Sequence, residues 1–162
     1  MTRAALFSCI LALCAWISIP VGDIAFTMQT FGMFLTLGVL GGKWGSISIG
    51  IYLLLGAAGM PVFAGFQGGP GILLGATGGY LWGFLASGIL FQLTERWGKL
   101  PAMILGLLAC YLCGSLWFSF WAGANSLTLI LLRCVVPYLI PDAIKLALAH
   151  KLSLRLGQQL RK

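Results

Sequence analysis

Residues 59–84 read GMPVFAGFQGGPGILLGATGGYLWGF and contain no charged residue. The two prolines and the paired glycines of this stretch interrupt helical hydrogen bonding, so part of its backbone must be irregular. A hydrocarbon environment tolerates irregular backbone only where it is buried in protein or lines a cavity. The stretch is therefore the first place in the chain to look for a small-molecule site.

The composition of the whole chain excludes an ordinary soluble domain. Of the 162 residues, 60% are hydrophobic and 8% are charged, whereas roughly 25% of the residues in typical globular domains are charged. Long apolar runs separated by short polar breaks predict an all-α membrane protein that forms a single domain over residues 1–162. The net charge of +7 does not indicate nucleic-acid binding, because the basic residues lie at the ends of apolar segments, as expected beside a lipid bilayer.

We predict six transmembrane helices, with the glycine-rich stretch as a loop between the third and the fourth. The predicted bounds are residues 4–19, 31–40, 46–58, a fourth helix that ends near residue 93, 101–121 and 127–152, followed by a basic tail over 155–162. The charged start and short apolar run of the first segment resemble a signal peptide. No convincing cleavage site follows it, so we interpret this segment as a short spanning helix.

The positions of the basic residues predict how these helices are oriented. In this topology one face carries Arg3, Lys43, Arg96, Lys99, Lys151, Arg155, Arg161 and Lys162. The opposite loops contain no Lys or Arg and only Asp23. Because cytoplasmic loops are enriched in Lys and Arg, we predict a multi-pass protein of the cell membrane. Both termini are then cytoplasmic, and the glycine-rich loop faces outward.

Small residues form one smooth face on the first predicted helix. Ala4, Ser8 and Ala12 recur every four residues, and small residues at this spacing let another helix approach closely in lipid. The face is a candidate docking surface for a partner subunit. Packing inside the protein is the alternative.

Three ionisable residues lie in or near the last predicted helix: Arg133, Asp142 and Lys145. Ionisable groups in a membrane are costly, so they indicate a functional site by default. Asp142 and Lys145 are three residues apart and share a helix face, and Pro137 and Pro141 before them favour a kink. A self-neutralising ion pair inside the bundle is the alternative for Asp142 and Lys145. Arg133 lies nearer the outer end, where it either contacts a ligand or reaches the interface.

No metal, cofactor or nucleotide site is predicted. The five cysteines all lie in apolar segments, and Cys110-x-x-Cys113 lacks a second ligand pair, which favours small core residues. Gly98-Lys99-Leu100 lacks the Ser or Thr and the upstream glycine of a phosphate loop. Active transport by this chain would therefore draw on an ion gradient or on a partner.

The central stretch offers the surfaces that a small amphipathic ligand needs. Glycines at positions 71, 75, 79 and 83 would form a groove on a helix, which admits another helix or a flat ligand. Thr77 and Tyr80 supply hydroxyl groups. Aromatic surface comes from Phe63, Phe66, Trp82 and Phe84. Gln29 and Asn125 could reach the ligand from the outer side.

Three segments of this chain resemble the BioY family. Residues 60–66 (MPVFAGF) and 75–84 (GATGGYLWGF) are similar to its first signature, and residues 137–145 (PYLIPDAIK) are similar to its second. Residues 27–32 (TMQTFG) match the segment before the second span. The resemblance covers the whole chain in order and length. One departure is Ala76, where the family commonly has Pro.

The resemblance implies a biotin-binding S component of an energy-coupling-factor (ECF) transporter, a six-helix membrane subunit that captures the vitamin from outside. Such proteins work with a transmembrane coupling subunit and with two cytoplasmic ATPase subunits, which hydrolyse the ATP, so this chain is expected to carry no cofactor. By the resemblance, Asp142 and Lys145 are the charges that contact the ligand. The full set of candidate substrate-binding residues is Asp142, Lys145, Thr77, Gly78, Gly79, Tyr80, Arg133 and Gln29. The carboxylate of biotin would bind Lys145, Arg133 or Thr77, and the coupling subunit would dock on the face of Ala4, Ser8 and Ala12.

Other classes of protein stay open from the residues alone. An S component for another vitamin would have the same composition. A membrane enzyme would need paired carboxylates or a Ser/His or Cys/His pair, but Asp23, Glu95 and Asp142 lie in separate segments and the single histidine, His150, lies near a basic terminus. We therefore predict no enzymatic activity. A structural bundle would not require a charged pair behind two prolines.

Overall fold

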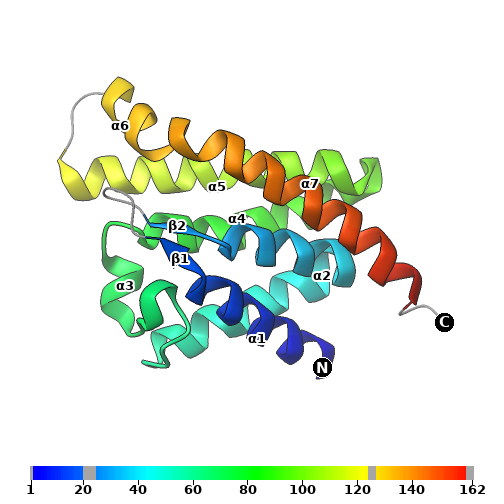
Figure 1. The fold of residues 1–162 in the computed structure, drawn as a ribbon. Coiled ribbons are helices and arrows are strands. Elements are labelled where there is room, and N and C mark those ends of the chain that lie inside the picture. The colour runs from blue at the N-terminus through cyan, green and yellow to red at the C-terminus, as the bar shows by residue number, and fades with distance from the viewer. Residues whose placement is uncertain (1, 20–24, 124–126, 160–162) are drawn as a thin grey trace.

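The computed structural model describes residues 2–19, 25–123 and 127–159 and shows a bundle of helices (Figure 1). Its longer helices are α1 (Thr2–Trp16), α2 (Gln29–Ala57), α4 (Gly78–Thr94), α5 (Lys99–Ala122), α6 (Leu127–Cys134) and α7 (Val136–Gln159). Two short antiparallel strands, β1 (Ser18–Ile19) and β2 (Phe26–Thr27), form a hairpin after α1. The start of α1 and the end of α7 lie at the same end of the bundle, and the hairpin and α6 lie toward the other (Figure 1).

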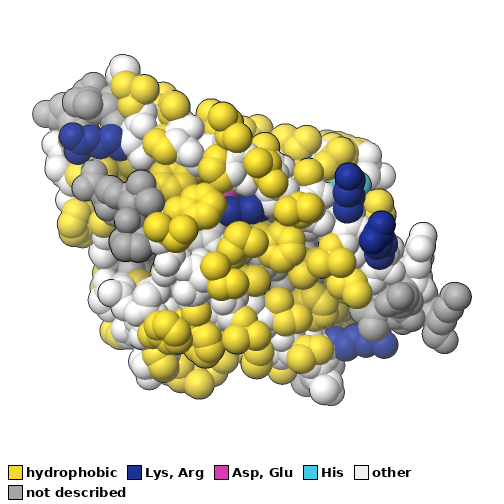
Figure 2. Space-filling model, in the orientation of Figure 1, with side chains coloured by type: hydrophobic (Ala, Val, Ile, Leu, Met, Phe, Trp, Pro, Cys, Tyr) yellow, Lys and Arg dark blue, Asp and Glu magenta, His cyan; other side chains and the backbone are white. Residues whose placement is uncertain are grey.

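The surface of the bundle is unusually apolar for a protein in water. Figure 2 shows hydrophobic side chains over much of the visible face, while most of the visible Lys and Arg side chains lie toward the end where α1 begins and α7 ends. Leu54, Ile140 and Phe120 are 72%, 76% and 88% exposed. Large contiguous apolar surface marks contact with membrane or partner. Among the described residues, α2 and α5 are long and apolar enough to cross a membrane, and α1 is a shorter apolar helix.

Helix α2 contains the second and third predicted helices. Gly41 breaks it with φ 78° and ψ 171°, and the second half turns back along the bundle (Figure 1). Side chains between the end of α4 and the start of α5 complete the break: Glu95 Oε2 accepts a hydrogen bond from the Gly42 N–H at 2.9 Å, and Lys99 Nζ donates to the Gly38 carbonyl at 2.7 Å. An anion therefore caps the start of one half-helix and a cation the end of the other, as the helix dipole favours.

The structure corrects the bounds of the first and last predicted helices. Helix α1 ends at Trp16 rather than residue 19, because Ser18 and Ile19 pair with Thr27 and Phe26. The last predicted helix is two helices, since α6 ends at Cys134 and α7 begins at Val136. The break therefore precedes the two prolines that favoured it. Helix α7 continues to Gln159, so most of the predicted basic tail is helical.

The glycine-rich stretch is irregular, as predicted. It contains the single turn η1 (Ala64–Phe66) and the short helix α3 (Pro70–Leu74), and η2 (Glu95–Trp97) is a similar turn after α4. Phe66 has φ 58°, which is costly for a residue with a bulky side chain. Gly69 has φ 101° directly before Pro70, a conformation that suits glycine. This segment folds over one end of the bundle and supplies part of the wall of a cavity.

Candidate ligand-binding site

A cavity of about 100 Å³ lies among the hairpin, α2, the glycine-rich segment, α4, α5 and the α6–α7 pair. Its lining is mostly apolar and aromatic, with a few polar groups and one acid–base pair, which is the usual character of a small-molecule site. The lining residues are Ala25, Thr27, Gln29, Thr30, Phe63, Ala64, Gln67, Ile72, Thr77, Tyr80, Leu81, Phe84, Cys110, Tyr111, Cys134, Tyr138, Asp142 and Lys145.

The acid–base pair of α7 is almost completely buried. Asp142 is 3% exposed and Lys145 is 5% exposed, and Lys145 Nζ lies 2.9 Å from Asp142 Oδ1. They are the only acidic and the only basic side chain among the described residues that line the cavity. A charge in so dry a place is retained only with a partner and with hydrogen bonds to its remaining polar atoms.

Hydroxyl groups from two other helices hold the carboxylate of Asp142. Thr30 Oγ1 of α2 donates to Oδ1 at 2.9 Å, and the Tyr111 hydroxyl of α5 donates to Oδ2 at 2.8 Å. Each carboxylate oxygen therefore accepts a bond from a different neighbour. This arrangement orients the carboxylate and leaves lone pairs that a ligand N–H can use.

The ammonium of Lys145 is held by the hairpin. Its Nζ donates to the Thr27 carbonyl at 2.6 Å and lies 3.9 Å from the centroid of the Phe26 ring. A desolvated cation over an aromatic face gains a cation–π attraction. Because Phe26 and Thr27 form strand β2, the hairpin between α1 and α2 closes over the charged pair.

Two further polar side chains of the lining, Gln29 and Tyr80, are also oriented by hydrogen bonds. Gln29 Nε2 donates to the Tyr52 hydroxyl at 2.7 Å, and the Thr27 hydroxyl donates to Gln29 Oε1 at 3.1 Å. The Tyr80 hydroxyl donates to the Cys134 carbonyl at 2.8 Å. That carbonyl ends α6, so the break between α6 and α7 supplies the acceptor for Tyr80.

The structure brings together five of the eight predicted substrate-binding residues. Asp142, Lys145, Thr77, Tyr80 and Gln29 line the cavity. The other three, Gly78, Gly79 and Arg133, do not belong to its lining. Arg133 is exposed, as in the interfacial alternative.

Gly78 and Gly79 permit close packing behind the cavity wall. A Cβ at Gly78 would collide with the backbone of Leu73, and a Cβ at Gly79 would collide with Trp117 and lie 2.8 Å from the Cys113 carbonyl. Gly83 faces α5 in the same way. Gly71 has nothing within 4 Å of its Cβ position. Of the predicted glycine groove, the α4 part at Gly79 and Gly83 packs against helix α5 and not against the cavity.

Residue-type reasoning missed the two hydroxyl donors of Asp142. Thr30 lies in the segment 27–32 that resembles the BioY family, and this resemblance is the signal that could have identified it. Tyr111 lies in the middle of an apolar helix, where a buried hydroxyl needs a partner. Of the other residues expected to reach the site, Phe63 and Phe84 line the cavity and Trp82 and Phe66 are 42% and 62% exposed, while Asn125 lies outside the described residues.

The glycine-rich segment is fastened to α1 above the cavity. Trp16 Nε1 donates to the Pro61 carbonyl at 2.8 Å, and the rings of Trp16 and Phe66 stack with centroids 4.9 Å apart. Phe63, from the same segment, packs edge-on against Tyr52 at 5.5 Å. One hydrogen bond and two ring contacts therefore attach the segment to α1 and α2.

The face of Ala4, Ser8 and Ala12 is covered within the protein. These residues are 3%, 2% and 8% exposed, and the Ser8 hydroxyl donates to the Ser48 carbonyl of α2 at 2.7 Å. The smooth face therefore admits α2. A partner subunit that docks on this face would need exposed surface there, and these three residues expose little.

Comparisons with known proteins agree with this architecture. The model of the BioY family matches residues 1–162. A protein of Thermotoga maritima named biotin transporter BioY is 38% identical over 161 residues, covering 96% of this chain and 94% of that protein. A probable biotin transporter BioY of Pyrococcus horikoshii is also 38% identical, over 156 residues, with the same coverage.

A solved structure has the same fold. It is the crystal structure of the S-component for biotin from an ECF-type ABC transporter, and it superposes with a TM-score of 0.88 at 27% sequence identity, covering 97% of this chain and 89% of that one. The predicted resemblance is thereby confirmed: this chain belongs to the BioY family.

Proposed function

We propose that this chain is the biotin-binding S component of an ECF-type transporter, and that it captures biotin in the cavity around Asp142 and Lys145. The observation that carries the proposal is the buried pair itself, which faces an apolar cavity and is oriented by three other elements. The names of the relatives support biotin as the ligand. As a transport subunit the chain binds its ligand and catalyses no reaction.

Biotin offers groups that match the two charges. Its ureido ring has two N–H donors and one carbonyl acceptor, so the carboxylate of Asp142 would accept from the ring and the ammonium of Lys145 would donate. The fused rings would lie against Tyr80, Phe63 and Phe84. The valerate carboxylate would bind Lys145, Thr77 or, at the mouth, Arg133.

We further propose six membrane spans, with the two halves of α2 as separate spans and the α6–α7 pair as the last. Both termini would be cytoplasmic and the glycine-rich segment would face outward, because most of the Lys and Arg side chains visible in Figure 2 lie toward the end of the bundle where α1 begins and α7 ends. The transmembrane coupling subunit and two ATPase subunits would supply the energy for import.

Equilibrium binding of biotin to the purified protein in detergent tests the proposed ligand. Thiamine and riboflavin are the comparison ligands, and Lys151→Ala, an exposed lysine of the same helix, is the control for Lys145→Ala. We expect tight binding of biotin alone, weakened in Lys145→Ala and Asp142→Asn but not in Lys151→Ala. Binding of another vitamin would replace the ligand, and no binding at all would remove the proposed function. Biotin methyl ester tests whether the carboxylate of biotin contacts the protein. The ester should bind less tightly than biotin only if that carboxylate makes a contact.

The substitution Ala12→Leu tests the predicted docking face. Ala12 is buried against α2, so we expect overpacking that costs about 1–3 kcal/mol and lowers thermal stability, biotin binding and uptake together. Ala5→Leu is the matched control, because Ala5 is exposed on the same helix. Loss of uptake in Ala12→Leu with full stability and full binding would instead show that the face docks the coupling subunit.

A further inference from the structure

A second, larger cavity lies at the end of the bundle opposite the candidate site. Its volume is about 720 Å³, and it is an open groove between the start of α1, the break in α2, the start of α5 and the end of α7. It is lined by Thr2, Arg3, Ala4, Val39, Leu40, Trp44, Lys99, Leu154, Gly157 and Gln158.

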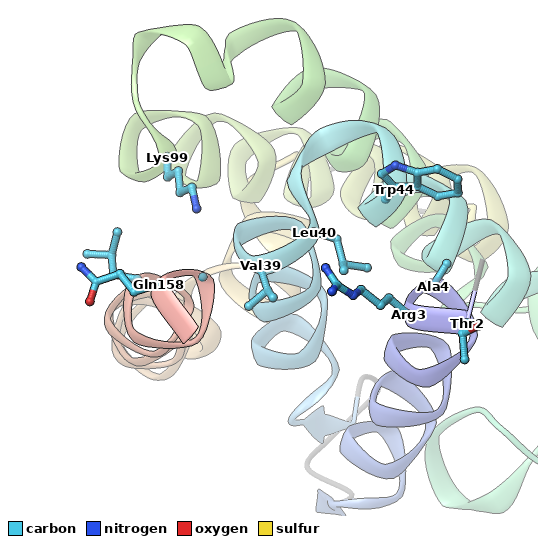
Figure 3. Close-up of a pocket in the computed structure, with 10 residues that line it drawn as sticks. Thr2, Arg3, Ala4, Val39, Leu40, Trp44, Lys99 and Gln158 are labelled. Atoms are coloured by element: carbon cyan, nitrogen blue, oxygen red, sulfur yellow. The ribbon is translucent and has the colours of Figure 1, made fainter. Parts of the chain in front are cut away.

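The groove combines two cations with an apolar floor. Figure 3 shows Arg3 extending from α1 toward Leu40, while Lys99 points from the start of α5 toward α2 and α7. Val39 and Leu40 lie between the two cations in this view. Half of the lining residues are apolar: Ala4, Val39, Leu40, Trp44 and Leu154. No acidic side chain of the described residues lines the groove.

Glu95, the acidic residue closest to Lys99 in the sequence, already has a hydrogen-bond partner. Glu95 accepts a hydrogen bond from the Gly42 N–H, so it serves the break in α2. Lys99 uses one donor on the Gly38 carbonyl and keeps two for another acceptor. The groove therefore carries two positive charges without a matching negative charge among the described residues, and it is complementary to an anion.

The apolar part of the lining decides what kind of anion fits. A free inorganic phosphate would leave Val39, Leu40 and Leu154 in contact with water. A phospholipid would place its phosphate near the cations and its glycerol and first methylenes on the apolar floor. Trp44 is 43% exposed at this groove, and Trp is enriched where membrane proteins meet the headgroup region.

We propose that this groove binds the headgroup of an anionic phospholipid, with Arg3 and Lys99 as its phosphate-binding residues. The proposal uses the membrane orientation given above, in which this end faces the cytoplasmic leaflet. It does not depend on the identity of the vitamin. A bound lipid at this position would join α1, α2, α5 and α7.

Native mass spectrometry of the purified protein with dioleoyl phosphatidylglycerol or dioleoyl phosphatidylcholine tests the proposal. We expect preferential retention of phosphatidylglycerol. Because one basic side chain near an anionic headgroup is worth about 1 kcal/mol, Arg3→Gln should lower that retention about fivefold. Lys43→Gln is the matched control, since Lys43 is exposed at the same end of the bundle and does not line the groove. Its retention of phosphatidylglycerol should stay near that of the parent protein.

Each other result overturns the proposal. Equal retention of the two lipids, or equal losses in Arg3→Gln and Lys43→Gln, would mean that the groove has no specific lipid site. Displacement of the lipid by millimolar inorganic phosphate would identify a free-anion site. Unchanged lipid retention in Arg3→Gln, with less coupling subunit recovered in the purified complex, would identify a protein contact. Biotin binding measured on the same samples separates these failures from a failure of the proposed function.

Discussion

Replacement of Lys145 by Met is expected to abolish biotin binding and to destabilise the protein strongly. The substitution leaves the carboxylate of Asp142, which is 3% exposed, without its counter-ion 2.9 Å away. Breaking a buried ion pair by removing one partner costs about 3–5 kcal/mol. Thermal unfolding in detergent and equilibrium biotin binding are the two measurements.

A second substitution separates stability from ligand binding. In the Asp142→Asn/Lys145→Met double variant neither charge remains, and replacing a whole buried pair by neutral groups is often harmless to stability. We therefore expect the double variant to recover most of the lost thermal stability and still not to bind biotin. If the double variant binds biotin as tightly as the parent, the pair is only structural. If Lys145→Met alone is as stable as the parent, the pair is not buried as described.

Replacement of Gly79 by Ala is expected to destabilise the protein and to weaken biotin binding, although Gly79 does not line the cavity. A Cβ at this position would lie 2.8 Å from the Cys113 carbonyl and collide with Trp117, so α4 and α5 must separate. Overpacking of this kind typically costs about 1–3 kcal/mol. The shift would also move Tyr80, the next residue, whose hydroxyl is bonded to the Cys134 carbonyl.

Gly71→Ala is the matched control for this prediction. Gly71 also lies in a helix, α3, and its Cβ position has nothing within 4 Å, so the same added methyl group meets no neighbour. We expect Gly71→Ala to leave thermal stability and biotin affinity near those of the parent protein. Equal losses in the two variants would mean that contact between α4 and α5 does not explain the result, since replacing a helical Gly by Ala is favourable in itself.

Local sequence patterns predicted the helices that are long and apolar and failed where one segment depends on another. The spans at 31–40, 46–58 and 101–121 correspond to the halves of α2 and to α5. The end of the first helix was wrong because Ser18 and Ile19 belong to a hairpin whose second strand is several residues away. The last helix breaks at Val135, between Cys134 and Val136, and not at the prolines. Pro137 is the second residue of α7, where its missing N–H costs no helical hydrogen bond, and Pro141 lies inside α7, which continues past it.

The sequence by itself determined the apolar helical class, the irregular central stretch and the charged pair at 142 and 145. These depend on composition and on spacing within one helix, which the order of residues specifies directly. Only the tertiary structure decided what surrounds the pair and what the small residues do. Thr30 and Tyr111 reach Asp142 from α2 and α5, Trp117 of α5 lies against the Cβ position of Gly79, and Ala12 is 8% exposed. A row of small residues indicates that another group approaches the helix closely, but only the packing of distant segments determines which group that is.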